Sequence, residues 1–139
     1  MAGTVEEIMT RDPRTVDAGD SVVDAARAMR DDDIGNVVVT DGGRVAGIVT
    51  DRDIAIRAIA EARDPQSTTV GNVCSSDLRT LEPGESVDEA VRAMREHNVR
   101  RLPVVRDGEL VGALSLGDLA KEREPDSALA DISAASPDR

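Results

Sequence analysis

The sequence predicts an α+β fold in which one β-α-β-β-α unit occurs twice. Residue i and residue i+65 match without a gap from Val5 and Val70 to Ala55 and Ala120. Within each copy, short apolar runs alternate with stretches in which apolar residues recur at helical spacing, which is typical of mixed strands and helices. A single copy of roughly sixty residues would be only marginally stable alone, because it buries too small a fraction of its surface. We therefore expect the two copies to share one interface.

The repeat also divides the chain into segments. The first copy covers residues 4–62 and the second covers 70–123, with a polar linker at 63–69 between them. Residues 124–139 are mostly small and polar and include two prolines. Because such a composition supplies no packed core, we expect this last segment to be a mobile tail.

The first half of each copy contains a brief strand and an amphipathic helix. In the first copy, a helical turn at residues 5–9 should deliver the chain to a strand at 14–16. Capping boxes at residues 21–24 and 86–89 then open the helices. The apolar stripe expected on these helices is Val22, Ala25, Ala26 and Met29 in the first copy and Val87, Ala90, Val91 and Met94 in the second.

The second half of each copy reads as a hairpin followed by a helix. Residues 36–40 and 102–105 are unbroken β-branched or apolar runs, which favours buried strands. Glycine-containing turns follow at 41–43 and 107–108, and each should hand over to a second strand. The last helices are expected at residues 51–62 and 116–122.

A Gly-x-x-Thr/Ser-x-x-Asp motif joins the second strand to the last helix in each copy. It ends in Thr50 and Asp53 in the first copy and in Ser115 and Asp118 in the second. One interpretation is structural, since the hydroxyl can cap the helix while the acid reaches back to the cap. The other is functional, since a helix N-terminus attracts phosphate and a carboxylate can accept hydrogen bonds from both hydroxyls of a ribose. The two interpretations are compatible, and the motif alone does not choose between them.

The composition excludes several classes of protein. The chain has 139 residues, no Phe, Tyr or Trp, and a formal net charge of −11, which argues against a nucleic-acid partner and against an anionic membrane surface. A single cysteine, Cys74, permits no internal disulfide, and no apolar run has the length of a membrane span, so we expect a cytoplasmic protein. The only histidine, His97, has no partner for a metal site, and no nucleophile stands with a base, so we expect neither metal nor catalysis.

The doubled unit, the repeated motif and the segment from His97 to Val105 strongly resemble a tandem pair of cystathionine-β-synthase (CBS) domains, also called a Bateman module. The resemblance covers about residues 4–123 and is greatest to the stand-alone actinobacterial CBS-pair proteins of the hypoxic response protein 1 type. It implies two units packed with pseudo-twofold symmetry, and two clefts that bind AMP, ADP, ATP or S-adenosylmethionine.

The resemblance also assigns roles to particular residues. Asp53 and Asp118 match ribose-binding acids, and the hydroxyl residue of each motif matches the one near the first phosphate. Arg100 and Arg101 match a pair that approaches the phosphates, while the short strands at 15–16 and 80–81 match the backbone that reads the adenine edge. The full set of expected ligand-binding residues is Thr15, Val16, Asn36, Thr50, Arg52, Asp53, Thr80, Leu81, Arg100, Arg101, Ser115, Gly117 and Asp118.

The two clefts are not expected to be equivalent. Gly35 and Asn36 stand in the first copy where the second copy has two arginines. Leu116 and Gly117 of the second copy likewise replace Asp51 and Arg52 of the first. Because of its arginines, the Asp118 cleft is the better candidate for a ligand that carries phosphate.

We therefore expect a non-enzymatic regulatory or sensor module that requires no cofactor and takes an adenine nucleotide or S-adenosylmethionine as its ligand. One alternative is a ligand-independent interaction or scaffold protein, and another is a small enzyme acting on an adenosine compound. Similar modules pair their helical faces into flat dimers, and Val23, Ile56 and Ile59 are apolar beyond what one interface should cover, so we expect a homodimer. An unidentified protein partner would receive the signal.

Overall fold

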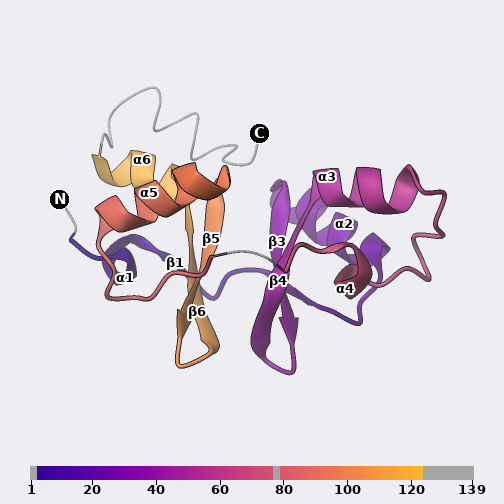
Figure 1. Ribbon diagram of the computed structural model, residues 1–139, viewed down its shortest axis with the longest axis horizontal. Helices are drawn as coiled ribbons and strands as arrows, with labels where there is room; N and C mark the ends of the chain where they lie inside the picture. The colour runs from indigo at the N-terminus through magenta and orange to yellow at the C-terminus, as the bar shows by residue number, and fades with distance from the viewer. Residues whose placement is uncertain (1–2, 77–78, 124–139) are drawn as a thin grey trace. The chain divides into compact units, whose positions relative to one another are not determined.

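The computed structural model describes residues 3–76 and 79–123, and these form a mixture of short helices and strands (Figure 1). The expected tail at 124–139 lies outside the described residues. The chain divides into two compact units. The contiguous unit is residues 14–78, and the composite unit joins residues 1–13 to residues 79–139. The mixed α+β class expected from the repeat is confirmed.

The contiguous unit is built around a hairpin. Strands β3 and β4 pair antiparallel, with a register shift between Val39 and Thr40, and β2 runs parallel to β3. Strand β2 is displaced by one residue from the expected strand at 14–16, because its ladder with β3 continues to Asp17. The elements of this unit are β2 (Thr15–Asp17), α2 (Val22–Asp32), β3 (Asn36–Asp41), β4 (Arg44–Thr50), α3 (Asp51–Ile54), η1 (Ala55–Ile59) and α4 (Val70–Val73).

The composite unit has the matching hairpin, in which β5 and β6 pair antiparallel. The expected strand at 80–81 is reduced to a single parallel bridge between Leu81 and Val104. Strand β1, which the sequence did not predict, pairs antiparallel with β6; two residues are too few to show a strand periodicity. The elements of this unit are α1 (Val5–Ile8), β1 (Thr10–Arg11), α5 (Val87–His97), β5 (Arg101–Arg106), β6 (Glu109–Ser115) and α6 (Leu116–Arg123).

Each unit is completed by a short helix that belongs, in sequence, to the other repeat. In the composite unit, the Val5 amide of α1 donates to the Glu85 carbonyl at 2.9 Å. In the contiguous unit, the Val70 amide of α4 donates to the Asp20 carbonyl at 2.8 Å. The compact units and the sequence repeats therefore have different boundaries, because these backbone hydrogen bonds join α1 and α4 to segments far along the chain.

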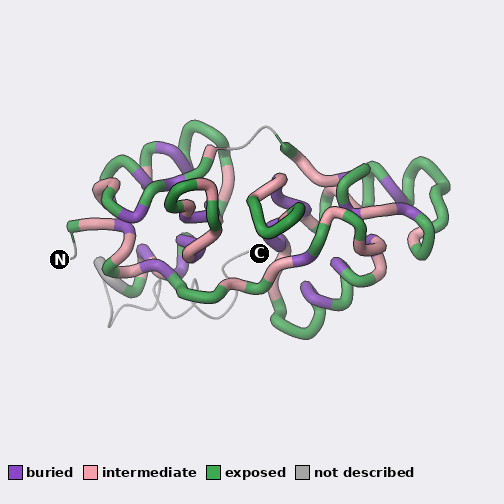
Figure 2. Tube along the Cα trace, turned by 90° about the horizontal axis from the view of Figure 1, so that it is seen from below, coloured by how far each residue is buried: buried purple, intermediate pink, exposed green. Residues whose placement is uncertain are grey.

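Both cores are aliphatic, as a chain without aromatic residues requires, and buried positions recur along the helices (Figure 2). The expected stripes were partly wrong: Ala28 is buried on α2 while Ala26 is exposed, and Ala93 is buried on α5 while Val91 is only half-buried. The buried residues recur at i, i+3, i+6 and i+7, so three of the four expected positions are correct and the buried face includes i+6 in place of i+4. Within residues 3–76 and 79–123, no helix has the length and apolar character needed to cross a membrane.

The helix expected at 51–62 is not regular. Helix α3 ends at Ile54 and continues as the π-helix η1, in which the Ala60 amide donates to the Ala55 carbonyl at 2.9 Å. This bond reaches five residues back instead of four, and one further π-type bond follows from Arg63 to Ala58. The π turn keeps Ala58 fully buried while two isoleucines of η1 remain exposed.

Candidate functional site

The two Thr/Ser-x-x-Asp motifs occupy matching places, at the end of the second hairpin strand in each unit. The register places Arg101 directly opposite Ser115 and Asn36 directly opposite Thr50. The Leu116 amide also donates to the Arg100 carbonyl at 2.8 Å. The structure therefore brings both arginines of the expected site next to the motif of the composite unit, while the motif of the contiguous unit has Asn36 in that position.

Both motifs form complete capping boxes. The Asp53 amide donates to the Thr50 hydroxyl at 3.0 Å, and the Thr50 amide donates to Asp53 Oδ2 at 3.0 Å. In the composite unit the same two bonds join Ser115 and Asp118 at 3.1 and 3.0 Å. The structural interpretation of the motif is thus confirmed in both copies. A ligand would have to use the remaining acceptor capacity of each carboxylate, chiefly Oδ1.

The carboxylates of the two motifs have different neighbours. The Thr10 hydroxyl of β1 donates to Asp118, lying 3.3 Å from both carboxylate oxygens. Asp53 instead faces Arg57, whose Nε lies 3.9 Å from Oδ1. The expected set contained neither partner. The four-residue spacing of Asp53 and Arg57 is a helical ion-pair signal that could have revealed the second contact.

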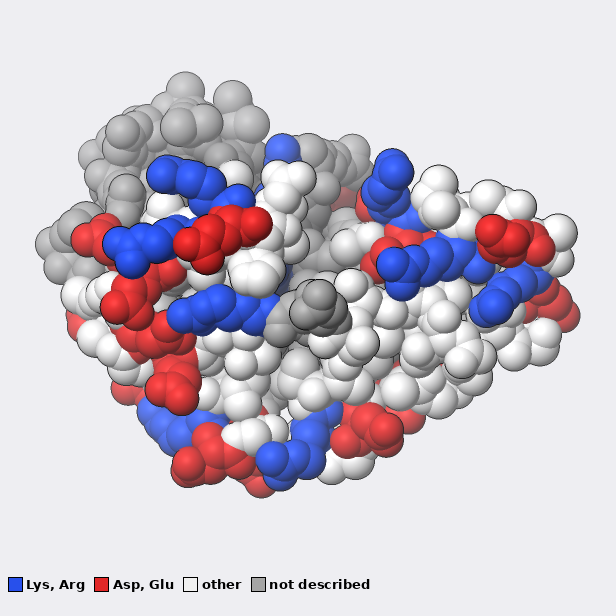
Figure 3. Space-filling model, in the orientation of Figure 1, with Lys and Arg blue, Asp and Glu red and all other residues white. Residues whose placement is uncertain are grey.

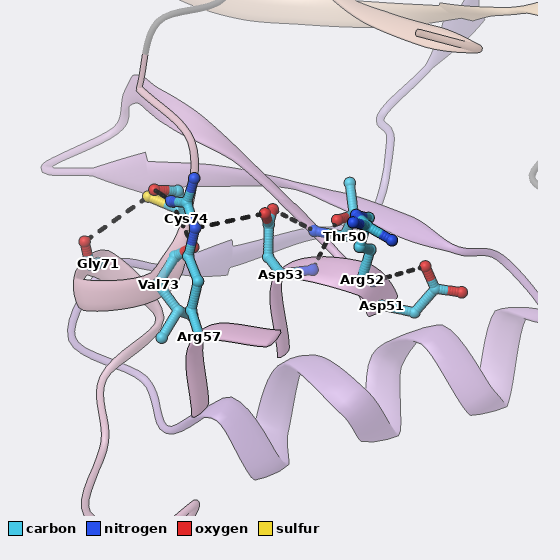
Figure 4. Close-up of polar contacts among 8 residues, drawn as sticks. All are labelled: Thr50, Asp51, Arg52, Asp53, Arg57, Gly71, Val73 and Cys74. Carbon is cyan, nitrogen blue, oxygen red and sulfur yellow. Dashed lines mark hydrogen bonds and ion pairs between the residues drawn. The ribbon is translucent and has the colours of Figure 1, made fainter. Parts of the chain in front are cut away.

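Arg57 also ties the motif of the contiguous unit to the end of α4 (Figure 4). Its Nη1 donates to the carbonyls of Val73 and Cys74 at 3.3 and 3.4 Å. Burial, and then the negative charge of Asp53, raises the pKa of the Cys74 thiol. A thiol with a raised pKa is a poor nucleophile, and Cys74 occupies the position that matches the apolar Met9 of the first copy.

Several other expected residues lie beside the first strand of each hairpin or in the first turns of the motif helices. Thr15 and Val16 pair with Val38 and Val39 across the parallel β2–β3 ladder of the contiguous unit. The backbone of Leu81 bonds on both sides of Val104 in the composite unit, accepting from Val105 at 2.8 Å and donating to Pro103 at 2.9 Å. In the first helical turns, Arg52 is exposed and Gly117 is buried.

One cavity of about 370 Å³ lies in the composite unit, near β1 and the turn between β5 and β6. None of the expected ligand-binding residues lines it. Its lining residues are Glu6, Met9, Arg11, Asp12, Pro13, Arg106, Leu110 and Val111.

Two further properties bear on the class of ligand. Among the described residues, no group of three His, Cys, Asp or Glu side chains is arranged to hold a metal ion. On the face drawn in Figure 3, the Lys and Arg side chains of the described residues are interspersed with Asp and Glu side chains. That face therefore offers no continuous basic stripe from the described residues of the kind that nucleic-acid binding requires.

Comparison with known proteins defines the class. The family model of the CBS domain matches residues 5–59 and 70–124, and the chain therefore belongs to the CBS-domain family as a tandem CBS pair. The chain is 39% identical over 117 residues to the CBS domain-containing protein YhcV of Bacillus subtilis, covering 84% of this chain and 83% of the relative. It is 34% identical over 119 residues to hypoxic response protein 1 of Mycobacterium tuberculosis, covering 85% of this chain and 83% of the relative.

Solved structures agree with this assignment. A crystal structure of Hypoxic Response Protein I with two coordinated zinc ions matches with a TM-score of 0.80 at 33% identity, covering 85% of this chain and 97% of that one. The CBS domain pair of protein MJ0100, solved with 5′-methylthioadenosine and S-adenosyl-L-methionine, matches with a TM-score of 0.77 at 25% identity, covering 89% and 98%. CBS pairs are regulatory ligand-binding modules, and proteins with this domain are generally regulatory and not catalytic.

Proposed function

We propose that this chain is a non-enzymatic sensor that binds an adenosine-containing ligand through Asp118, with a second, different site at Asp53. The observation that supports this most is the arrangement around the first turn of α6. There a capping carboxylate with spare acceptor capacity, a buried hydroxyl residue and the strand position of Arg101 come together. The crystal structure of the MJ0100 CBS pair with 5′-methylthioadenosine and S-adenosyl-L-methionine supports the choice of an adenosine compound as the ligand.

The chemistry of the Asp118 site divides into two parts. Asp118 would accept hydrogen bonds from the ribose hydroxyls, at its Oδ1 and on the free side of Oδ2. The Ser115 hydroxyl and the positive N-terminal end of the α6 dipole would face the first phosphate, with Arg101 as its counter-ion. Since the Asp53 site has Asn36 in place of Arg101, we propose that a phosphate-rich ligand prefers the Asp118 site.

A direct test uses the absence of aromatic residues. The chain has no Trp or Tyr and hardly absorbs near 280 nm, so a purified sample that absorbs near 260 nm contains a bound nucleotide. Mass spectrometry of the released compound would identify it. We expect AMP, ADP, ATP or S-adenosylmethionine either to be carried through purification or to bind on calorimetric titration below millimolar concentration.

The scaffold alternative has one observation in its favour. The capping hydrogen bonds alone would account for both motifs without any ligand, because each acid already satisfies a cap amide. If no adenosine compound is carried through purification and none binds below millimolar concentration, the ligand proposal fails and the scaffold function replaces it.

We also propose that the chain forms a homodimer through the face that carries η1. Ile56 and Ile59 lie three residues apart and are 49% and 58% exposed, so two large apolar side chains of η1 face solvent. A second copy could cover this apolar ridge isologously. Light scattering should give a mass of twice 14.7 kDa at micromolar concentration.

The dimer prediction has a charge-matched control. Ile59→Glu should shift the mass to that of a monomer, because dimer formation would bury the new carboxylate without a partner. Gln66→Glu adds the same charge at an exposed loop residue and should leave the mass unchanged. A monomeric wild-type chain at micromolar concentration would refute the dimer.

A further inference from the structure

Among the described residues, Arg57 pairs with the motif acid Asp53, and the second copy has no basic residue at the matching position. The residue sixty-five positions later is Glu122, so the second copy has an acid where the first has a guanidinium. Asp118 has the neutral hydroxyl of Thr10 beside it, whereas Asp53 has a cation at 3.9 Å. The two motif carboxylates therefore differ in the group that holds them.

The geometry around Arg57 leaves an acceptor on Asp53 available. The distance from Nε to Oδ1 is 3.9 Å, which is an ion pair and too long for a hydrogen bond. Asp53 Oδ2 accepts from the Thr50 amide, while Oδ1 has Arg57 as its nearest cation. Oδ1 thus retains lone pairs that a ligand hydroxyl could use, with a positive charge beside it.

Arg57 is itself held by backbone carbonyls at the end of α4. Two hydrogen bonds to the carbonyls of Val73 and Cys74 fix its guanidinium against the C-terminal end of α4 (Figure 4). A cation at that end of a helix is also favoured by the orphan carbonyls there. The Asp53 side chain is only 15% exposed, so a loss of Arg57 would leave a mostly buried carboxylate without its cation.

From this geometry we infer that Arg57 is a positioning residue for the Asp53 site. It holds the Asp53 carboxylate between the Thr50 amide and the end of α4, with Oδ1 directed to accept a ribose hydroxyl. This inference rests on the proposed function for its ligand, but the positioning itself is measurable without a ligand. It predicts that Arg57 acts on ligand binding only through Asp53, so that a phosphate on the ligand is not required for its effect.

The first test reads the position of Asp53 in the ligand-free protein. In Arg57→Ala, hydrogen exchange of the Thr50 amide should accelerate by about threefold or more, because its acceptor is less well held. The Ser115 amide, which makes the same bond to Asp118, should not change and serves as an internal control. Arg63→Ala removes an exposed arginine of the same unit and should change neither amide.

The second test measures coupling in the binding of adenosine, with Asp118→Ala as the background so that only the Asp53 site remains. Arg57→Ala should weaken adenosine binding by about 3- to 10-fold, the range of coupling for neighbouring residues when one is half exposed. In the Asp118→Ala background, Arg57→Ala should weaken AMP binding by the same factor as adenosine binding. When Asp53→Ala is added to that background, Arg57→Ala should cause no further loss of affinity.

The outcomes separate this inference from the proposed function. If Arg57→Ala changes neither the hydrogen-exchange rate of the Thr50 amide nor the affinity for adenosine, the inference is overturned while the sensor function stands. The inference is also overturned if Arg57→Ala lowers the affinity for adenosine equally with Asp53 present and with Asp53 replaced by alanine, since Arg57 would then act independently of Asp53. If Asp53→Ala in the Asp118→Ala background binds adenosine with the same affinity as the Asp118→Ala chain, the proposed ligand function fails at the Asp53 site. The hydrogen-exchange rate of the Thr50 amide alone then decides whether Arg57 positions Asp53.

Discussion

Replacing Asp118 by alanine is expected to weaken the binding of adenosine at its site by about 10- to 1000-fold. The carboxylate would accept hydrogen bonds from two ribose hydroxyls, and hydrogen bonds to a charged group contribute about 1.5–3 kcal/mol each. The capping interpretation alone makes a different forecast: the free energy of unfolding would fall by about 1 kcal/mol and no affinity would change. Calorimetric titration combined with thermal unfolding measures both quantities in one set of samples.

Two variants sharpen this comparison. Asp118→Asn keeps an oxygen that can accept from the Ser115 amide but removes the charge, so it should preserve most of the stability and still weaken binding. Arg101→Ala should weaken AMP and ATP while leaving adenosine almost unaffected, because its guanidinium would contact only phosphate. Equal affinity of wild type and Asp118→Ala for every adenosine compound would contradict the assignment of Asp118 to the ribose.

Gly47→Ala is expected to have the second large effect, on stability. A Cβ at Gly47 would overlap the Ser75 carbonyl oxygen, which is backbone and cannot turn aside. Ser75 is held there by a pair of hydrogen bonds with Ile48, at 2.9 and 3.0 Å. Overpacking of this kind costs about 1–3 kcal/mol and more when hydrogen bonds must separate, so the melting temperature should fall by roughly 5–10 °C.

Other glycines provide the comparison for this prediction. Gly84→Ala is the matched control, because a Cβ there meets no atom within 4 Å and its effect on melting should be small. Gly112 is the counterpart of Gly47, but its nearest contact is the flexible Met9 side chain at 2.6 Å, with the Thr10 carbonyl at 2.8 Å. Gly112→Ala should therefore destabilise less than Gly47→Ala. If the melting temperature of Gly47→Ala equals that of the wild type, the segment around Ser75 is not bound to β4 in solution.

The sequence by itself determined the features that depend on local patterns and that occur in both copies of the repeat. The two hairpins, the glycine turns and the caps at Thr50 and Ser115 each depend on residues within a few positions of one another, so their spacing was sufficient. The family assignment also followed from these features, because the motifs recur in register. The placement of Arg101 beside Ser115 then follows from the register of a single hairpin.

Tertiary structure alone decided which segments complete each unit and what faces each motif acid. Strand β1 has two residues and Leu81 forms one bridge, so neither has a periodicity to read; long-range backbone hydrogen bonds define both. The contact of Thr10 with Asp118 spans 108 residues of sequence, which no local spacing can indicate. The π turn of η1 likewise depends on how its buried face meets the core, because helix propensity for this alanine-rich segment favours a regular α-helix.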